Sequence, residues 1–214
     1  MAQPRRPAGR HCGQLPRALD HHNQTARLAR QAGDTLTEAA AAAHQGAPLL
    51  RLNQPQKALE ALQRGLTLYQ AAVVPHQRGQ ALLERQLGIA LARLGRGSEA
   101  EEHFRAVESV FVEHGEPYLL ARLGLDRAQL ALDAEEPTAA LEHLARAKQR
   151  FSGWSDPDLA RLRYLTAAAH TRNGDHDAAR PLADAVPPAK ELPDKHPTAP
   201  LVWNLTDPSS GTTA

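Results

Sequence analysis

Alanine and leucine recur along most of the chain in a pattern that repeats about every 40 residues. The clearest copy is LGIALARLGRGSEAEEHF at residues 87–104, where Ala100 follows Gly95 by five residues and Phe104 follows by four more. Alanines in the same relation to a small or polar residue stand at positions 18, 58, 100, 140 and 179, separated by 40, 42, 40 and 39 residues. The chain is therefore predicted to be an array of about five similar units.

Each unit is predicted to form two antiparallel helices. Pro55 and Pro137 stand three residues before the alanines of their units, where a missing N–H suits the first turn of a helix. Ser98 and Glu101 form a candidate capping box in the same phase, and Asp175 is a candidate N-cap. The predicted first helices cover 36–52, 77–94, 117–134 and 157–172, and the second helices cover 16–32, 56–72, 98–114, 137–151 and 176–185.

The two ends of the chain differ from this array. Residues 1–12 hold two prolines and a glycine and are predicted to be flexible. The repeat domain is predicted over 13–186, and it starts with half a repeat, which suggests that something precedes Gly13. Residues 187–214 are rich in proline, so a disordered tail is expected there. Within it, Trp203 belongs either to a short docking motif or to the disordered end.

Composition supports an all-α fold and excludes several classes of protein. Alanine and leucine favour helices, whereas aromatic residues make up only 4% of the chain. The net charge of +1 indicates no general attraction to nucleic acid or membranes. Cys12 is the only cysteine, so no internal disulfide is expected. Without an apolar run of membrane-spanning length or a secretory signal, a cytoplasmic location is expected.

The best-preserved unit resembles the tetratricopeptide repeat (TPR) in the order of its key residues, which are Leu87, Gly88, Leu91, Gly95, Ala100 and Phe104. The aromatic position is lost elsewhere, where His22 and Ala183 (or Leu182) take its place. The period exceeds the usual repeat of about 34 residues. Longer units ending in Gly-Asp, as at Gly33 and Asp34, resemble the repeat regions of bacterial, actinobacterial-type regulators. Armadillo and HEAT repeats share the period but do not explain this residue order.

The resemblance implies a right-handed α-solenoid of antiparallel helix hairpins, whose concave face is lined by the first helices. Its arginines would suit an acidic peptide, because a guanidinium pairs with a carboxylate. Ala47, Ile89 and Ala168 stand where related proteins clamp a terminal carboxylate, so that clamp is not predicted. The expected partner-binding residues are His44, Arg51, Arg85, Gln86, Arg93, Arg122, Asp126, Gln129, Asp133, Tyr164 and Arg172.

No residue pattern indicates catalysis, a cofactor or a metal. His21, His103 and His143 occupy equivalent positions in three second helices, but the intervening unit has Ala61 there. Zinc needs three or four converging ligands, so surface histidines are predicted. Cys12 lies beside His11 in the flexible terminus and is not expected to act as a nucleophile. The glycines near Gly95 lack the Lys-Ser/Thr of a phosphate-binding loop.

The leading hypothesis is a non-catalytic protein–protein interaction module, part of or related to a bacterial transcriptional or signalling regulator. The alternative is a peptide-sensing regulator that binds a small signal in the concave groove. Nucleic acid would be reached only through another domain or partner. The unpartnered edge of the helix at 16–32 suggests a homodimer as a further arrangement.

Overall fold

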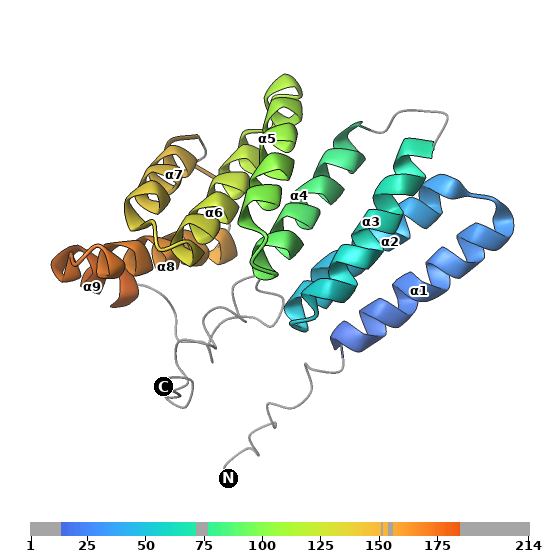
Figure 1. The fold of residues 1–214 in the computed structure, drawn as a ribbon, viewed down its shortest axis with the longest axis horizontal. Coiled ribbons are helices and arrows are strands. Elements are labelled where there is room, and N and C mark those ends of the chain that lie inside the picture. Colours follow the sequence, from blue (N-terminus) through green and yellow to red (C-terminus); the bar gives the residue numbers. More distant parts are fainter. Residues whose placement is uncertain (1–13, 72–76, 151, 154–155, 185–214) are drawn as a thin grey trace, which may run out of the picture. The chain divides into compact units, whose positions relative to one another are not determined.

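The structure is a computed structural model that describes residues 14–71, 77–150, 152–153 and 156–184. This part of the chain is all-α and contains no strand (Figure 1). Its helices are α1 (Gln14–Ala32), α2 (Thr35–Arg51), α3 (Pro55–Ala71), α4 (Gln77–Arg93), α5 (Gly97–Glu113), α6 (Pro117–Asp133), α7 (Pro137–Arg150), α8 (Asp156–Arg172) and α9 (His176–Asp184). The predicted helices are confirmed, with ends within two residues of those observed. The predicted flexible N-terminus and the predicted tail lie outside the described residues.

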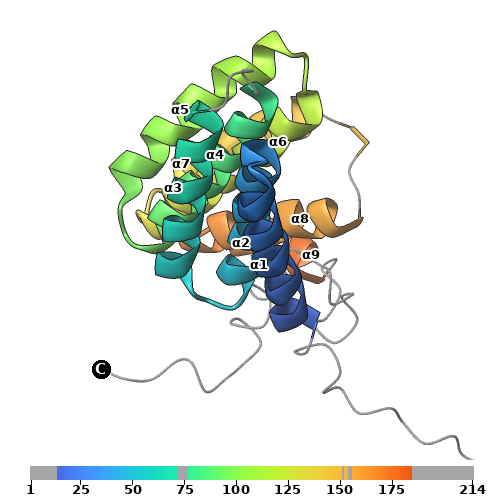
Figure 2. The same ribbon diagram turned by 90° about the vertical axis from the view of Figure 1, so that its right-hand side faces the viewer.

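Contacts between helices divide the chain into two compact units, Met1–Arg96 and Gly97–Ala214, each of which is described by itself. In the first unit α1 and α3 both pack on α2, and α4 packs on α2 and α3 (Figure 2). In the second unit consecutive helices from α5 to α9 pack in pairs, and α8 also contacts α6. None of the described helices is both long and apolar enough to cross a membrane.

Tight turns of one kind end the helices. A left-handed residue, with φ between 53° and 80°, occurs among the described residues at Gly33, Asn53, Gly95, Gly115, Glu135 and Gly174. The N–H of the following residue then donates to a carbonyl in the last turn, as from Arg96 to Leu91 at 3.0 Å. Four of these residues precede a repeat alanine by five positions. The small or polar residue five positions before a repeat alanine is therefore the turn residue that follows a first helix.

The starts of the second helices follow the prediction in three cases out of four. Pro55 and Pro137 are the first residues of α3 and α7, and the Asp175 carboxylate accepts a hydrogen bond from the N–H of Ala178 at 3.2 Å. The capping box at Ser98 was wrong, because α5 begins at Gly97 and places Ser98 inside the first turn. The turn at Gly95 is so tight that the next helix starts two residues later.

The core consists mainly of leucine and alanine. Four of the residues that carry the repeat pattern, Leu87, Leu91, Ala100 and Phe104, are each at most 3% exposed, so the pattern marks core positions. In the second unit a cluster of buried side chains from α6, α7 and α8 includes Leu125, Leu144 and Leu165. With so few aromatic residues, the helices must approach closely to exclude water.

In the pairs α2/α3 and α6/α7 that approach depends on a contact between two small residues. A β-carbon on Gly124 of α6 would lie 2.9 Å from the Ala147 Cβ and 3.2 Å from the His143 carbonyl oxygen in α7. In the first unit, a β-carbon on Gly65 of α3 would lie 3.3 Å from the Ala42 Cβ in α2. The two contacts are equivalent, because Gly124 and Ala147 lie 82 positions after Ala42 and Gly65, respectively. In the first unit the alanine lies on the first helix and the glycine on the second helix, and in the second unit this order is reversed.

Gly124→Ala is therefore expected to lower the free energy of unfolding by about 1–3 kcal/mol, although alanine is the better helix former. The backbone oxygen of His143 cannot rotate away from the new methyl group. Adding Ala147→Gly reproduces the first unit's arrangement, so the double variant should be more stable than the sum of the two single changes. Urea denaturation of the four proteins measures this coupling, and strictly additive effects would contradict it.

Candidate functional site

The predicted partner-binding residues fall in the first helices of both units. In the first unit His44 and Arg51 lie on α2, and the predicted residues of α4 are Arg85, Gln86 and Arg93. In the second unit α6 and α8 carry Arg122, Asp126, Gln129, Asp133, Tyr164 and Arg172. Arg85 and Asp126 are only 7% and 3% exposed, so these two are buried instead of lining an accessible surface.

Two of the predicted arginines bind backbone at the end of a neighbouring first helix. Arg93 of α4 donates to the carbonyl oxygen of Leu50 in α2 at 2.5 Å. Arg172 of α8 donates in the same way to the carbonyl oxygen of Leu132 in α6. Each carbonyl also accepts a hydrogen bond from the turn residue, Asn53 or Glu135, and a cation at a helix carboxyl end interacts favourably with the helix dipole. These arginines therefore join successive first helices.

Polar side chains also connect α6 and α8 in the second unit. Arg161 contacts the Asp126 carboxylate at 2.9 Å, and both side chains are almost fully buried. Nearby, the Tyr118 hydroxyl donates to Asp158 at 2.7 Å, and Arg122 lies 3.6 Å from the same carboxylate. Burial, followed by the hydrogen bond to Asp158, raises the pKa of Tyr118. These polar residues hold two helices together.

The remaining predicted residues of the second unit have local partners or surroundings. Gln129 donates to Asp133 at 2.8 Å along α6. Burial raises the pKa of Tyr164, whose side chain packs against the apolar cluster. Among the predicted residues of this unit, Asp133 and Arg172 are exposed.

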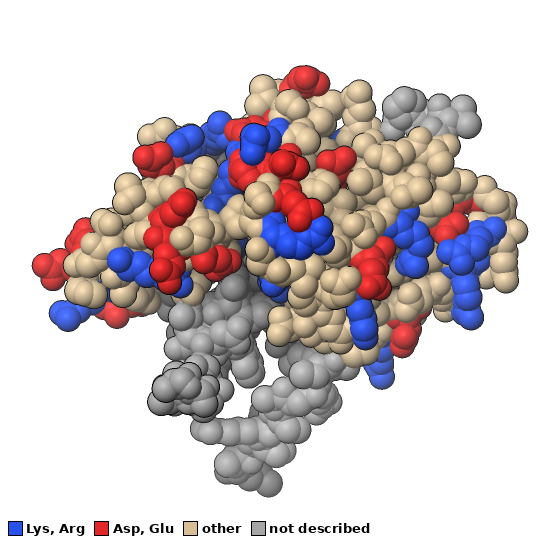
Figure 3. All heavy atoms as spheres, in the orientation of Figure 1, with Lys and Arg blue, Asp and Glu red and all other residues tan. Residues whose placement is uncertain are grey.

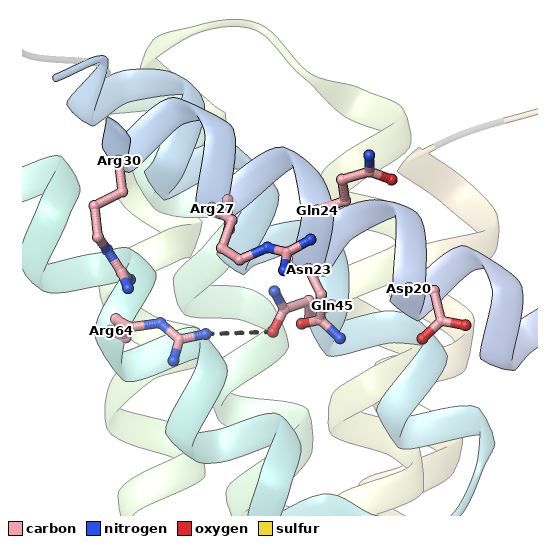
Figure 4. Close-up of a pocket in the computed structure, with 8 residues that line it drawn as sticks. Asp20, Asn23, Gln24, Arg27, Arg30, Gln45 and Arg64 are labelled. Atoms are coloured by element: carbon pink, nitrogen blue, oxygen red, sulfur yellow. Dashed lines mark hydrogen bonds between the residues drawn. The ribbon is translucent and has the colours of Figure 1, made fainter. Parts of the chain in front are cut away.

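The first unit contains a groove that the sequence analysis missed. It has a volume of about 520 Å³ and lies between α1 and α3, with α2 beneath it. Figure 4 shows the side chains of Arg27, Arg64, Gln45 and Asn23 directed toward one another, whereas Asp20 lies farther along α1. The residues that line the groove are Asp20, Asn23, Gln24, Ala26, Arg27, Arg30, Gln45 and Arg64.

Gln45 is the most buried polar group in this groove. It is 5% exposed, and its Oε1 accepts a hydrogen bond from Arg64 at 3.3 Å. Its Nε2 finds no hydrogen-bond partner among the described residues. A buried amide donor without a partner is energetically costly. The groove therefore offers an unused donor beside exposed guanidinium groups.

The arginines that line the groove differ in whether they have a partner of opposite charge. Arg30 binds Glu38 of α2, with its Nε 2.9 Å from the carboxylate. Within the described part of the chain, neither Arg27 nor Arg64 forms an ion pair. The groove extends toward Lys57 along an apolar floor that includes Leu49. This surface therefore combines unneutralised positive charge with apolar area.

The equivalent position in the second unit is filled by the chain itself. Arg127, 82 positions after Gln45, contacts Glu101 at 2.9 Å and Glu108 at 2.5 Å, both from α5. Arg150 of α7 contacts Glu108 at 3.2 Å. Although burial acts to raise it, hydrogen bonds from Arg127 and Arg150 lower the pKa of Glu108. The polar residue between these helices is thus neutralised internally.

His22, which replaces the aromatic of the repeat, contacts the predicted residue His44. Their rings stack with centroids 5.4 Å apart. Burial lowers the pKa of His22, and the nearby His44 and His21 lower it further. Protonating His22 is therefore less favourable in the folded chain than in the unfolded chain.

The described residues include no group of three or more His, Cys, Asp or Glu side chains placed to hold a metal ion. His143, one of the three histidines in equivalent positions, lies beside the Arg127 cluster. Burial, then the charges of Arg127 and Arg146, lower its pKa. Cys12 and His11 lie outside the described residues.

Comparison with known proteins bears on the fold of the chain. Neither a family model nor a curated protein matches the sequence. Among solved structures, the chain is similar to the crystal structure of BtubC (BKLC) from P. vanneervenii. The TM-score is 0.53 and the identity 12%, over 80% of this chain and 89% of that one. At this identity the likeness concerns the helical fold alone.

Arg127→Gln, which introduces the first unit's residue, should lower the free energy of unfolding by about 2 kcal/mol, because two carboxylates lose their partner. The loss should appear above about pH 4.5, the ordinary pKa of Glu108. It should vanish as the pH falls through the lower folded pKa. Denaturation at several pH values measures it. Arg146→Gln is the control, since its exposed pair with Glu142 contributes little, and an equal loss in both variants would refute the interpretation.

His22→Phe should stabilise the chain by roughly 1 kcal/mol at pH 8, because the aromatic position gains an apolar ring. The gain should be larger at pH 5. A histidine with a lowered pKa binds fewer protons when folded than when unfolded, so stability falls as the pH drops below the ordinary value of 6.5. Thermal unfolding across this range tests the difference. The same change at exposed His176 should bring no comparable stabilisation, because an exposed ring buries little apolar area; an equal gain for both variants would exclude a role for His22.

Proposed function

We propose that the chain is a non-catalytic protein–protein interaction module of the TPR type, built as a right-handed solenoid of antiparallel hairpins. The observation that carries the proposal is the exact recurrence of structural roles. The left-handed turn residue, the small-residue contact and the arginine at the helix carboxyl end each return at equivalent positions. Repeats of this kind create extended surfaces for binding other proteins.

The roles of the buried polar residues support the same proposal. Arg161 with Asp126, and Arg127 with its two glutamates, bind neighbouring helices within their unit. Their chemistry is therefore used to hold the repeats together. The exposed surface is the part of the repeat domain that we propose recognises another chain. A link to a bacterial transcriptional or signalling regulator follows only from the sequence resemblance.

The first helices supply the proposed contact surface. Ala47 lies on α2 between the predicted residues His44 and Arg51 and is exposed. Asp133 lies at the end of α6 and is also exposed. Because several arginines lie nearby in sequence, the favoured ligand on this surface is an acidic peptide segment, and its binding should weaken with salt.

Site-specific photo-crosslinking tests this proposal with the full chain. A benzoylphenylalanine at Ala47 or Asp133 should crosslink to a protein segment in a lysate of the source organism, and mass spectrometry identifies the segment. Glu102, exposed on second helix α5, is the matched control position. Reproducible crosslinks at the first two positions support the proposal. Their absence, or equal crosslinking at Glu102, contradicts it.

A further inference from the structure

We propose that the groove between α1 and α3 is a second binding site, which takes carboxylate side chains from an acidic segment of another protein. Exposed Arg27 and Arg64 flank it, and Gln45 lies at its base with a buried, unpartnered Nε2. It is formed mainly by second helices, and its lining includes none of the residues predicted to bind a partner. The inference rests on the proposed function only in taking the ligand to be a protein segment.

The second unit shows how carboxylates occupy this position when the chain supplies them. There Arg127 receives two carboxylates, from Glu101 and Glu108 of α5. At the equivalent positions on α1, 82 residues earlier, stand Leu19 and Ala26. The first unit thus lacks both carboxylates while it keeps a buried polar group between the helices.

The guanidinium groups of the first unit's groove stand at other positions, because Arg127 and Arg150 correspond there to Gln45 and Leu68. Arg64 of α3 is the equivalent of Arg146 of α7. Arg146 pairs with Glu142 at 2.9 Å, whereas the hydrogen bond of Arg64 is to neutral Gln45. Arg27 adds a second guanidinium from α1. A carboxylate entering here would accept charge-assisted hydrogen bonds from donors that the chain leaves unneutralised.

The groove's own acids do not fill this position. Asp20 lies along α1 away from the guanidinium groups (Figure 4), and Glu60 accepts a hydrogen bond from Gln56 at 3.2 Å. Toward Lys57 the lining becomes apolar, with Leu49, Leu52 and Ala61. The expected ligand therefore combines acidic and small apolar side chains.

A peptide fits this surface better than a nucleic acid. The chain carries a net charge of +1, and Figure 3 shows acidic and basic side chains interspersed on the visible face of each unit. Nucleic-acid binding depends on many phosphate contacts along a basic surface. A short carboxylate-bearing segment needs only the few donors that the groove provides.

Fluorescence anisotropy with the full chain and a labelled Glu–Ala alternating decapeptide tests the proposal. The peptide should bind at low salt, and the Gln–Ala version should not. Arg27→Gln and Arg64→Gln should each weaken binding by about tenfold, the effect of losing one charge-assisted hydrogen bond. Arg146→Gln, the same change at the equivalent exposed position, should change binding by less than about twofold.

A second variant tests whether a carboxylate at the position equivalent to Glu108 blocks the groove of the first unit. Ala26→Glu places a carboxylate at the position equivalent to Glu108, so it should weaken peptide binding by about tenfold while the chain stays folded. Circular dichroism verifies folding. Ala26→Gln provides a matched neutral change, which should bind the peptide more tightly than Ala26→Glu even if both lose some affinity through size.

Several outcomes would overturn the proposal. These are no binding of the acidic peptide, equal losses for Arg64→Gln and Arg146→Gln, or displacement of the peptide by inorganic phosphate at concentrations where acetate has no effect, which would assign the groove to phosphate. Loss of peptide binding in Ala47→Glu, or tighter binding in Asp133→Lys, with no effect of Arg27→Gln and Arg64→Gln, would place the ligand on the first helices. In that case the proposed function stands and the second site fails.

Discussion

Close approach of neighbouring helices is the constraint on which the rest of the structure depends. With few aromatic side chains available, the core must be closed by leucine and by direct contact between small residues. In both contacts, Ala42–Gly65 and Gly124–Ala147, one helix carries glycine and the other alanine. A methyl group added to the glycine would crowd the facing alanine. Within each unit the tight left-handed turns serve the same end, because they let a helix pack against its predecessor without a long connection.

Helices packed this closely leave little water between them, so polar groups at their contacts need partners within the protein. The second unit meets this need with Arg127 and its two glutamates, and with Arg161 and Asp126. The first unit has Gln45 at the position of Arg127 and no glutamates on α1 to match. The same repeat therefore fills this position with its own charges in one unit and leaves guanidinium groups exposed beside it in the other, and the residues at these three positions make the difference.

The first helices use their polar residues differently. Arg93 and Arg172 bind the carboxyl ends of the preceding first helices. The surface proposed for partner binding is thus also the surface along which successive repeats are joined. An acidic ligand there must compete with backbone carbonyls for some of the guanidinium groups, whereas Arg27 and Arg64 in the other groove face no such competition.

By itself, the sequence determined the helices, their order and the repeat. Propensity, proline placement and the five-residue spacing to each alanine are local signals, and they located nearly every helix end. Ser98 was misplaced because a turn that tight begins the next helix earlier than a capping pattern suggests. The tertiary structure decided which polar residues are available: Arg85 and Asp126 lie buried although their spacing placed them on a polar face. The groove at Gln45 could have been noticed by comparing residues 82 positions apart, but its open state depends on side chains from α1, α2 and α3 meeting in space. Packing between helices, which no local pattern records, determines whether a charge is buried, paired or free to bind.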